Sequence, residues 1–184
     1  MIEAYPVAMK VKPFLVVLVL MSVPISGCFG QNEIISQGGC YGKDSDSLGV
    51  IINELNAKGD WIEFCNSGDI DVNLQGLSIA DDPFINGEDN SSFFDLPDIT
   101  LPPKGYIVFT QNAKNSFSFG LYKGGETINL YSGLNGNGRI IDSTTWGYGE
   151  AGVDDGDGMS WGRCPDGNFY TLYNSTKGSP NNCD

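Results

Sequence analysis

The chain has 184 residues, and because 23 are Asp or Glu against 10 Lys or Arg, its formal net charge is −13. A surface this acidic repels phosphate groups, which disfavours nucleic acids and anionic lipid headgroups as partners. The sequence contains no histidine, which excludes Ser-His-Asp and Cys-His nucleophile activation and all metal sites that depend on imidazole ligands.

Residues 1–27 have the order of a secretory signal peptide. Basic Lys10 and Lys12 precede an apolar run at residues 14–23, which is too short to cross a bilayer as a permanent helix. Met9 suits such a signal better as a start than Met1, because the eight residues before it add nothing that export needs. We expect this segment to be removed from the exported protein.

The run Ile25-Ser26-Gly27-Cys28 resembles the lipobox of prokaryotic lipoproteins. In that motif the cysteine thiol receives a diacylglyceryl group and becomes the new N-terminus. An ordinary signal peptide that ends in small residues is the alternative. The lipobox implies a lipid on Cys28, a polar tether up to residue 47, and a domain at residues 48–184. This domain would be held in the cell envelope, at the extracytoplasmic face of a prokaryotic membrane.

Four further cysteines remain, namely Cys40, Cys65, Cys164 and Cys183. An even number in an exported protein indicates two disulfides. A four-cysteine metal site is the rival, although no pair has the close C-x₂₋₄-C spacing of such sites. Of the three possible pairings we favour Cys40 with Cys183, which would join the ends of the domain, and Cys65 with Cys164, which would join two predicted strands.

Short β-branched and aromatic runs alternate with Gly, Asn, Asp and Pro along the rest of the chain, and no stretch keeps apolar residues at helical spacing over three turns. Short strands separated by turn signals are typical of an antiparallel β-sandwich or barrel. The length suits a single domain. The predicted strands cover residues 49–55, 61–65, 72–79, 105–110, 127–131, 139–146 and 159–163, with an eighth candidate at 168–172.

The first two predicted strands form a hairpin if Lys58-Gly59 is a two-residue turn. Leu55 then faces Ile62, and Asn53 faces Phe64. The apolar residues Leu55, Ile62 and Phe64 share one side of this hairpin, which is therefore the predicted core face.

The same register places Glu54 directly across from Glu63 on the opposite face. Facing like charges destabilise a hairpin unless a cation or hydrogen-bond donors lie between them. We expect Arg163 to fill this role, in a structural ion cluster with the two glutamates. Paired carboxylates also act as general acid and base in glycosidases, so catalysis by Glu54 and Glu63 is the alternative.

Two loops are candidate functional segments. Residues 152–158 place Asp154, Asp155 and Asp157 among glycines, as calcium loops do, although the later bidentate Glu and the full D-x-D-x-D-G spacing are missing. Residues 81–98 form a long connection that carries Phe93 and Phe94 amid acidic residues. Long loops often bind partners, but the phenylalanines can equally anchor this loop to the core.

Residues 50–182 resemble the lamin tail domain, an immunoglobulin-like β-sandwich found in nuclear lamins and in many secreted prokaryotic proteins. Each matching piece is short, and the resemblance lies in their order and spacing. The pieces are Ile52-Asn53-Glu54, Trp61-Ile62-Glu63-Phe64-Cys65-Asn66, Leu74-Gln75-Gly76-Leu77-Ser78-Ile79-Ala80-Asp81, Leu101-Pro102-Pro103-Lys104-Gly105-Tyr106, Phe119-Gly120-Leu121, Gly125-Glu126-Thr127-Ile128-Asn129-Leu130, Ile141-Asp142, Arg163-Cys164-Pro165-Asp166-Gly167 and Gly178-Ser179-Pro180-Asn181.

Two positions depart from the family pattern. Cys65 replaces a large apolar or aromatic residue, and Lys177 stands where a proline commonly precedes the glycine. Since the domain also carries Cys164, the departure at Cys65 supports a bond between these two cysteines.

The resemblance implies a non-catalytic module that is displayed alone or beside exported enzymes. It does not identify the ligand, because unrelated functions share one fold. We therefore expect a lipid-anchored module that is not an enzyme, needs no cofactor, and binds a protein or a surface polymer rather than nucleic acid. A calcium-dependent adhesion module and a histidine-free hydrolase that uses Glu54 and Glu63 are the alternatives.

Overall fold

The computed structural model describes residues 34–36, 40–41, 49–81, 84–85, 88–89, 92–148, 150–151 and 158–184, and it describes the backbone alone for 34–36, 84–85 and 88–89. The predicted signal peptide, the lipidation site Cys28 and the calcium candidates Asp154, Asp155 and Asp157 lie outside these residues. Within the described ranges, no helix has the length and apolar character needed to span a membrane.

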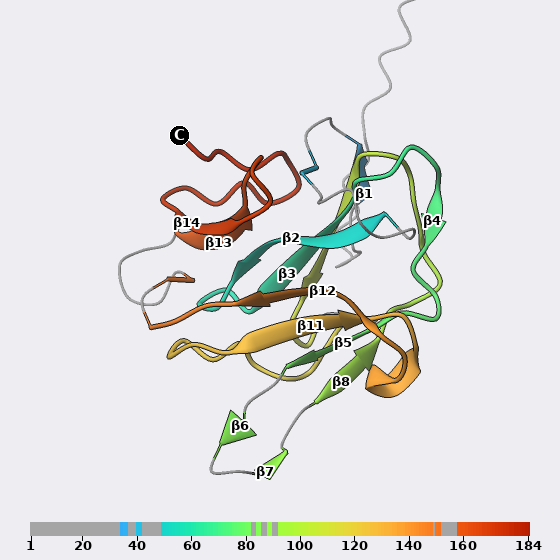
Figure 1. The fold of residues 1–184 in the computed structure, drawn as a ribbon, viewed down its shortest axis with the longest axis horizontal. Coiled ribbons are helices and arrows are strands. Elements are labelled where there is room, and N and C mark those ends of the chain that lie inside the picture. Colours follow the sequence, from blue (N-terminus) through green and yellow to red (C-terminus); the bar gives the residue numbers. More distant parts are fainter. Residues whose placement is uncertain are drawn as a thin grey trace, which may run out of the picture.

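Two antiparallel sheets form most of the fold (Figure 1). The six-stranded sheet has the order β1 (Ile34–Ser36), β10 (Gly105–Thr110), β3 (Trp61–Asn66), β2 (Val50–Asn56), β13 (Ser160–Arg163) and β14 (Phe169–Leu172). The four-stranded sheet has the order β12 (Ile140–Thr145), β11 (Thr127–Tyr131), β5 (Ser78–Asp81) and β8 (Phe93–Asp95). The antiparallel β-sandwich expected from the sequence is thus confirmed.

Smaller elements join these sheets. Strand β4 (Val72–Asn73) pairs with β9 (Thr100–Leu101), and β6 (Phe84–Ile85) pairs with β7 (Glu88–Asp89). A short 3-10 turn, η1 (Leu134–Gly136), connects β11 to β12. Strand β1 lies inside the segment at residues 28–47 that the sequence suggested was a tether. It pairs with β10 at the edge of the six-stranded sheet.

The core lies between the inner faces of the two sheets. Phe64 and Phe109 meet edge to face at 5.9 Å between ring centroids, and Phe94 from the other sheet approaches Phe109 at 5.7 Å. Alternate residues of each strand point inward, which explains the apolar pattern in the sequence. The fully buried aliphatic side chains of this core include Ile52, Leu55, Ile62, Leu74, Ile79, Leu101, Ile107 and Ile128.

The predicted strand at 72–79 is wrong in one respect, because it divides into β4 and β5. A turn at Gln75 and Gly76 separates the two strands, and Gly76 has a φ of +94°, a backbone conformation that glycine adopts at little cost. The Asn73 side chain accepts a hydrogen bond from the Gln75 amide at 2.7 Å, which stabilises this turn.

The hairpin between β2 and β3 has the predicted register near its turn and a different one further away. Leu55 pairs with Ile62, as expected, but Ile52 and not Asn53 pairs with Phe64. A β-bulge at Asn53 causes this shift by adding one residue to β2. Ile52 thereby enters the core, and the Asn53 side chain is free to join a polar network.

Two disulfides form, but the predicted pairing is wrong. Cys40 is bonded to Cys65, and Cys164 is bonded to Cys183. Strand β2 lies between β3 and β13, so Cys65 and the residue after β13 are two strands apart, or about 10 Å. A disulfide needs Cα atoms within about 7 Å, which rules out the bond from Cys65 to Cys164.

Peptide mapping without reduction should recover the Cys40 peptide joined to the Cys65 peptide. Replacing Cys164 and Cys183 together by serine is expected to lower the free energy of unfolding by about 2–4 kcal/mol, because the 19-residue loop no longer restrains the unfolded chain. Urea denaturation of this variant and of the parent measures the difference. A linked peptide that contains Cys65 and Cys164 would contradict the assignment.

Candidate functional site

Glu54 on β2 and Glu63 on β3 form the most unusual polar group of the fold, which we call the glutamate pair. They lie directly opposite each other, as predicted, and both side chains are 0% exposed. Residues 173–184, which we call the C-terminal strap, cover them on the outer face of the six-stranded sheet. Buried carboxyls are costly unless hydrogen bonds satisfy them, so the surrounding donors decide whether this arrangement is stable.

Donors from β13 and the strap satisfy Glu54. The hydroxyl of Ser160 donates to Oε1 of Glu54, and the Thr176 amide donates to the same oxygen at 2.9 Å. The Thr176 hydroxyl lies 2.8 Å from Oε2 of Glu54 and 2.9 Å from Oδ1 of Asn181.

Glu63 accepts hydrogen bonds on both oxygens. Nδ2 of Asn53 donates to Oε1 at 2.7 Å, and the Gly178 amide donates to Oε2. Asn181 completes the network, because its Nδ2 donates to the backbone oxygens of Asn53 and Arg163, each at 2.9 Å. The bulge at Asn53 is thus what brings a donor to Glu63.

Burial raises the pKa of both carboxyls. Loss of water contact is the largest effect on Glu63, and it raises the pKa to about 8 even though hydrogen bonds from Gly178 and Asn53 oppose it. Burial also raises the pKa of Glu54, against the opposing effects of Ser160, Thr176 and Lys177. The negative charge of Glu54 raises the pKa of Glu63 further.

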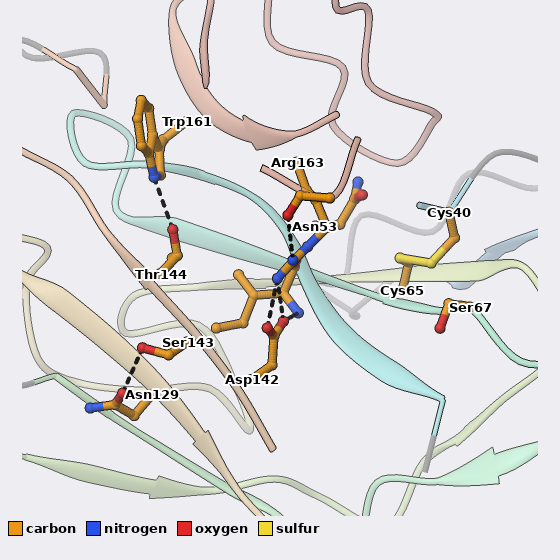
Figure 2. A network of polar contacts seen from close by, with 12 residues as sticks. Cys40, Asn53, Cys65, Ser67, Asn129, Asp142, Ser143, Thr144, Trp161 and Arg163 are labelled. Carbon is orange, nitrogen blue, oxygen red and sulfur yellow. Dashed lines mark hydrogen bonds and ion pairs between the residues drawn. A yellow bond between two sulfur atoms is a disulfide. The ribbon is translucent and has the colours of Figure 1, made fainter. Parts of the chain in front are cut away.

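The predicted ion cluster of Glu54, Glu63 and Arg163 is wrong, because among the described residues Arg163 forms its hydrogen bonds and its ion pair with groups other than the two glutamates. Its Nη2 lies 2.7 Å from Oδ1 and 2.6 Å from Oδ2 of Asp142 on β12, in the opposite sheet (Figure 2). Arg163 lies on β13, one strand away from β2, and its side chain turns toward the sandwich interior. Neutral donors, and not a guanidinium, therefore satisfy the glutamates.

Arg163 and Asp142 form the centre of a cross-sheet network. Nε of Arg163 donates to the Ile52 carbonyl at 3.0 Å, and the Ile52 amide donates to Asp142 at 2.8 Å. Nearby, Nε1 of Trp161 donates to the Thr144 hydroxyl at 2.9 Å (Figure 2). These contacts tie β12 to β2 and β13 and close one side of the sandwich.

Sequence reasoning missed the partners of both networks. Asp142, Thr176, Gly178 and Asn181 are separated by 90 or more residues from the groups on β2 and β3 that they contact. Asp142, Gly178 and Asn181 stand in sequence pieces that match the lamin tail pattern, and this match was the available signal that they matter. Their spacing in the sequence does not show which residues they contact.

A second buried acid lies at Glu126, which is 8% exposed. Its Oε2 accepts a hydrogen bond from the Tyr122 amide at 2.9 Å, while its Oε1 has no hydrogen-bond partner among the described residues. Burial, followed by the charges of Asp81 and Asp60, raises the pKa of Glu126 to about 7. Within the described ranges, no group of three or more Cys, Asp or Glu side chains could hold a metal ion.

In the connection at residues 81–98, the two neighbouring phenylalanines Phe93 and Phe94 point to opposite sides of β8. Phe94 packs into the core against Phe109 and Phe117. Phe93, on the opposite face of β8, is 47% exposed. The connection is therefore anchored by one ring and presents the other to solvent.

The geometry limits what the glutamate pair can do. Neither carboxyl reaches solvent while the strap is closed, so no substrate can approach them in this conformation. Both networks hold elements of the described fold together.

Comparison with protein-family models matches residues 43–148 to the Lamin Tail Domain. This range is more than half of the chain and runs from before β2 to just after β12. Comparison with curated proteins gives no match.

Proposed function

Because the chain belongs to the lamin tail domain family, we propose that it is a non-catalytic interaction module held by a lipid on Cys28 at the extracytoplasmic face of a prokaryotic membrane. Its partner is a protein or a surface polymer. The strongly acidic composition disfavours nucleic acid.

The distribution of the five cysteines carries this proposal. Four of them form two disulfides, which persist in oxidising compartments outside the cytoplasm. Cys28 is then the one cysteine left over, and it stands at the position where a lipobox requires a thiol for lipidation.

Burial of the glutamate pair supports a role without catalysis. A general acid and base must lie within hydrogen-bond reach of a substrate, whereas Glu54 and Glu63 are both covered by the strap. Their hydrogen bonds to Ser160, Thr176, Asn53 and Gly178 favour a structural role for both glutamates.

Two exposed apolar side chains favour the corner formed by β8 and η1 as the partner surface. Phe93 on β8 lies against Gly136 of η1, where a Cβ atom would come within 2.1 Å of the ring. Phe93 and Leu134, which stands in the same turn as Gly136, are each 47% exposed. Exposed apolar groups on a rigid sandwich are typical of interaction surfaces.

The tether would hold the domain close to the membrane. Because β1 begins at Ile34 and pairs with β10, only the residues between Cys28 and Ile34 can separate the lipid from the sheet. The six residue-to-residue steps from Cys28 to Ile34 span at most about 20 Å. The β1–β10 edge would therefore lie near the bilayer, and β14 at the other edge would be further from it.

Replacing Cys28 by serine tests the anchor in a prokaryotic host that processes lipoproteins. The parent protein should sediment with membranes and carry a diacylglyceryl group on an N-terminal Cys28, as measured by mass spectrometry, whereas the variant should be soluble. Cys183→Ser is the matched control, because it removes a disulfide and should leave the protein with the membranes. An unmodified N-terminus at any other residue would refute the proposal.

A further inference from the structure

The C-terminal strap is attached almost entirely by polar contacts. None of its residues belongs to the hydrophobic core of the sandwich, and none lies in a strand. Only Gly178 and Asn181 of the strap are buried, and they bind Glu63 and the backbone of Asn53. The disulfide between Cys164 and Cys183 fastens the far end. Closure of the strap therefore depends on the state of the glutamate pair.

Few charges face this pair. Strand β2 contributes Glu54, β3 contributes Glu63, β10 contributes the neutral Tyr106, and the strap contributes Lys177. Lys177 is exposed and stands over the Trp61 ring at 5.3 Å. Two ionised carboxylates would thus be buried against one solvated amine, which disfavours double ionisation.

The hydrogen-bond geometry independently indicates a proton on the pair. The Thr176 hydroxyl lies within hydrogen-bond distance of two acceptors, Glu54 and Asn181, but it carries a single hydrogen. If Glu54 is protonated on Oε2, it donates to the Thr176 oxygen and the Thr176 hydroxyl donates to Asn181. Both contacts are then full two-centre hydrogen bonds, whereas with both carboxyls ionised the single hydroxyl hydrogen must be shared between two acceptors.

We propose that the C-terminal strap is a proton-coupled cover, in which closure binds one proton on the Glu54–Glu63 pair and opening releases that proton to water. Opening hydrates the carboxylates and uncovers Leu172, which is 3% exposed beside Gly162 and Asn181. The Cys164–Cys183 disulfide keeps the opened strap attached, so closure is reversible. This device does not depend on the lipid at Cys28.

The sign of the pH effect follows from this linkage. The open pair ionises near the ordinary carboxyl pKa, while burial raises the pKa of closed Glu63 to about 8. Between roughly pH 5 and pH 8 only the closed state holds the proton, so each pH unit should increase the open fraction up to about tenfold. Below and above this window the open fraction should be constant.

Hydrogen exchange of the full chain tests the proposal, with rates corrected for intrinsic exchange. Protection of the Thr176 and Gly178 amides should fall up to tenfold per pH unit from pH 5 to pH 8, and it should remain lower than that of the Leu130 amide in β11. In the double variant Glu54→Gln/Glu63→Gln the pH dependence at the strap should be lost, because no carboxyl of the pair is left to bind the proton. Strap protection that is independent of pH, or equal to that of Leu130 at every pH, would overturn the proposal.

Two further measurements keep the test decisive if Glu54→Gln/Glu63→Gln does not fold. A carbon-13 titration of the parent protein should show one carboxyl of the pair ionising well above the ordinary carboxyl range, and ordinary midpoints for both glutamates would refute the coupling. In Cys164→Ser/Cys183→Ser, strap protection should be lower at each pH with the same slope. An unchanged protection would show that the strap does not open independently of the rest of the domain.

Discussion

Replacing Arg163 by methionine should lower the free energy of unfolding by about 3–5 kcal/mol, because it leaves the Asp142 carboxylate without its buried cation. The two side chains are 6% and 14% exposed. The change also removes donors from the carbonyls of Ile52 and Gly167 and a cation from above the Phe169 ring at 4.4 Å. Urea denaturation followed by tryptophan fluorescence measures the loss.

The matched control is the exposed pair of Lys104 and Asp69, whose charged atoms lie 3.3 Å apart. Asp69 is 94% exposed, so Lys104→Met should cost less than about 1 kcal/mol. Adding Asp142→Asn to Arg163→Met should recover part of the loss, since no unpaired charge then stays buried. A cost for Arg163→Met as small as that for Lys104→Met would show that the cross-sheet network does not hold the two sheets together.

The sequence was sufficient to predict the strands and the fold because these depend on local alternation and on turn residues. Leu55 opposite Ile62, and Glu54 opposite Glu63, follow from the position of the turn alone. The resemblance to the lamin tail domain is confirmed by the family match over residues 43–148. Local chemistry thus places most strands of the two sheets, whereas the edge strands β1 and β8 were not predicted.

Contacts between distant segments could not be predicted in the same way. The pattern of β2 gives no sign that Asn53 is an extra residue in the ladder, so Asn53 was predicted to pair with Phe64 in place of Ile52. Cys65 was paired with Cys164 because both lie in or beside predicted strands, but pairing depends on the strand order, which places β2 between β3 and β13.

Arg163 shows a third kind of error. Arg163 was assigned to the two glutamates as a compensating cation, whereas the fold turns its side chain to Asp142 in the other sheet. Apart from Asn53, the donors to the glutamates are Ser160, Thr176 and Gly178, which lie far along the chain. Charge balance predicts that a partner exists, but only tertiary structure identifies it.

Raising the pH from 5 to 8 should reduce the free energy of unfolding of the whole domain. Burial raises the pKa of Glu63 to about 8 and that of Glu126 to about 7. Over this window the folded state holds protons that the unfolded chain releases, so unfolding is favoured as the pH rises. Each held proton contributes about 1.4 kcal/mol per pH unit, and urea denaturation at several pH values measures the slope.

Single substitutions separate the two acids. Glu126→Gln should flatten the slope mainly below pH 7, while Glu63→Gln should flatten it up to pH 8, because each removes one titrating group from the linkage. Asp69→Asn, at a side chain that is 94% exposed, should leave the slope unchanged. A stability that rises from pH 5 to pH 8 would contradict the raised pKa values of Glu63 and Glu126, because a folded state with both carboxyls ionised holds no extra proton for the unfolded chain to release.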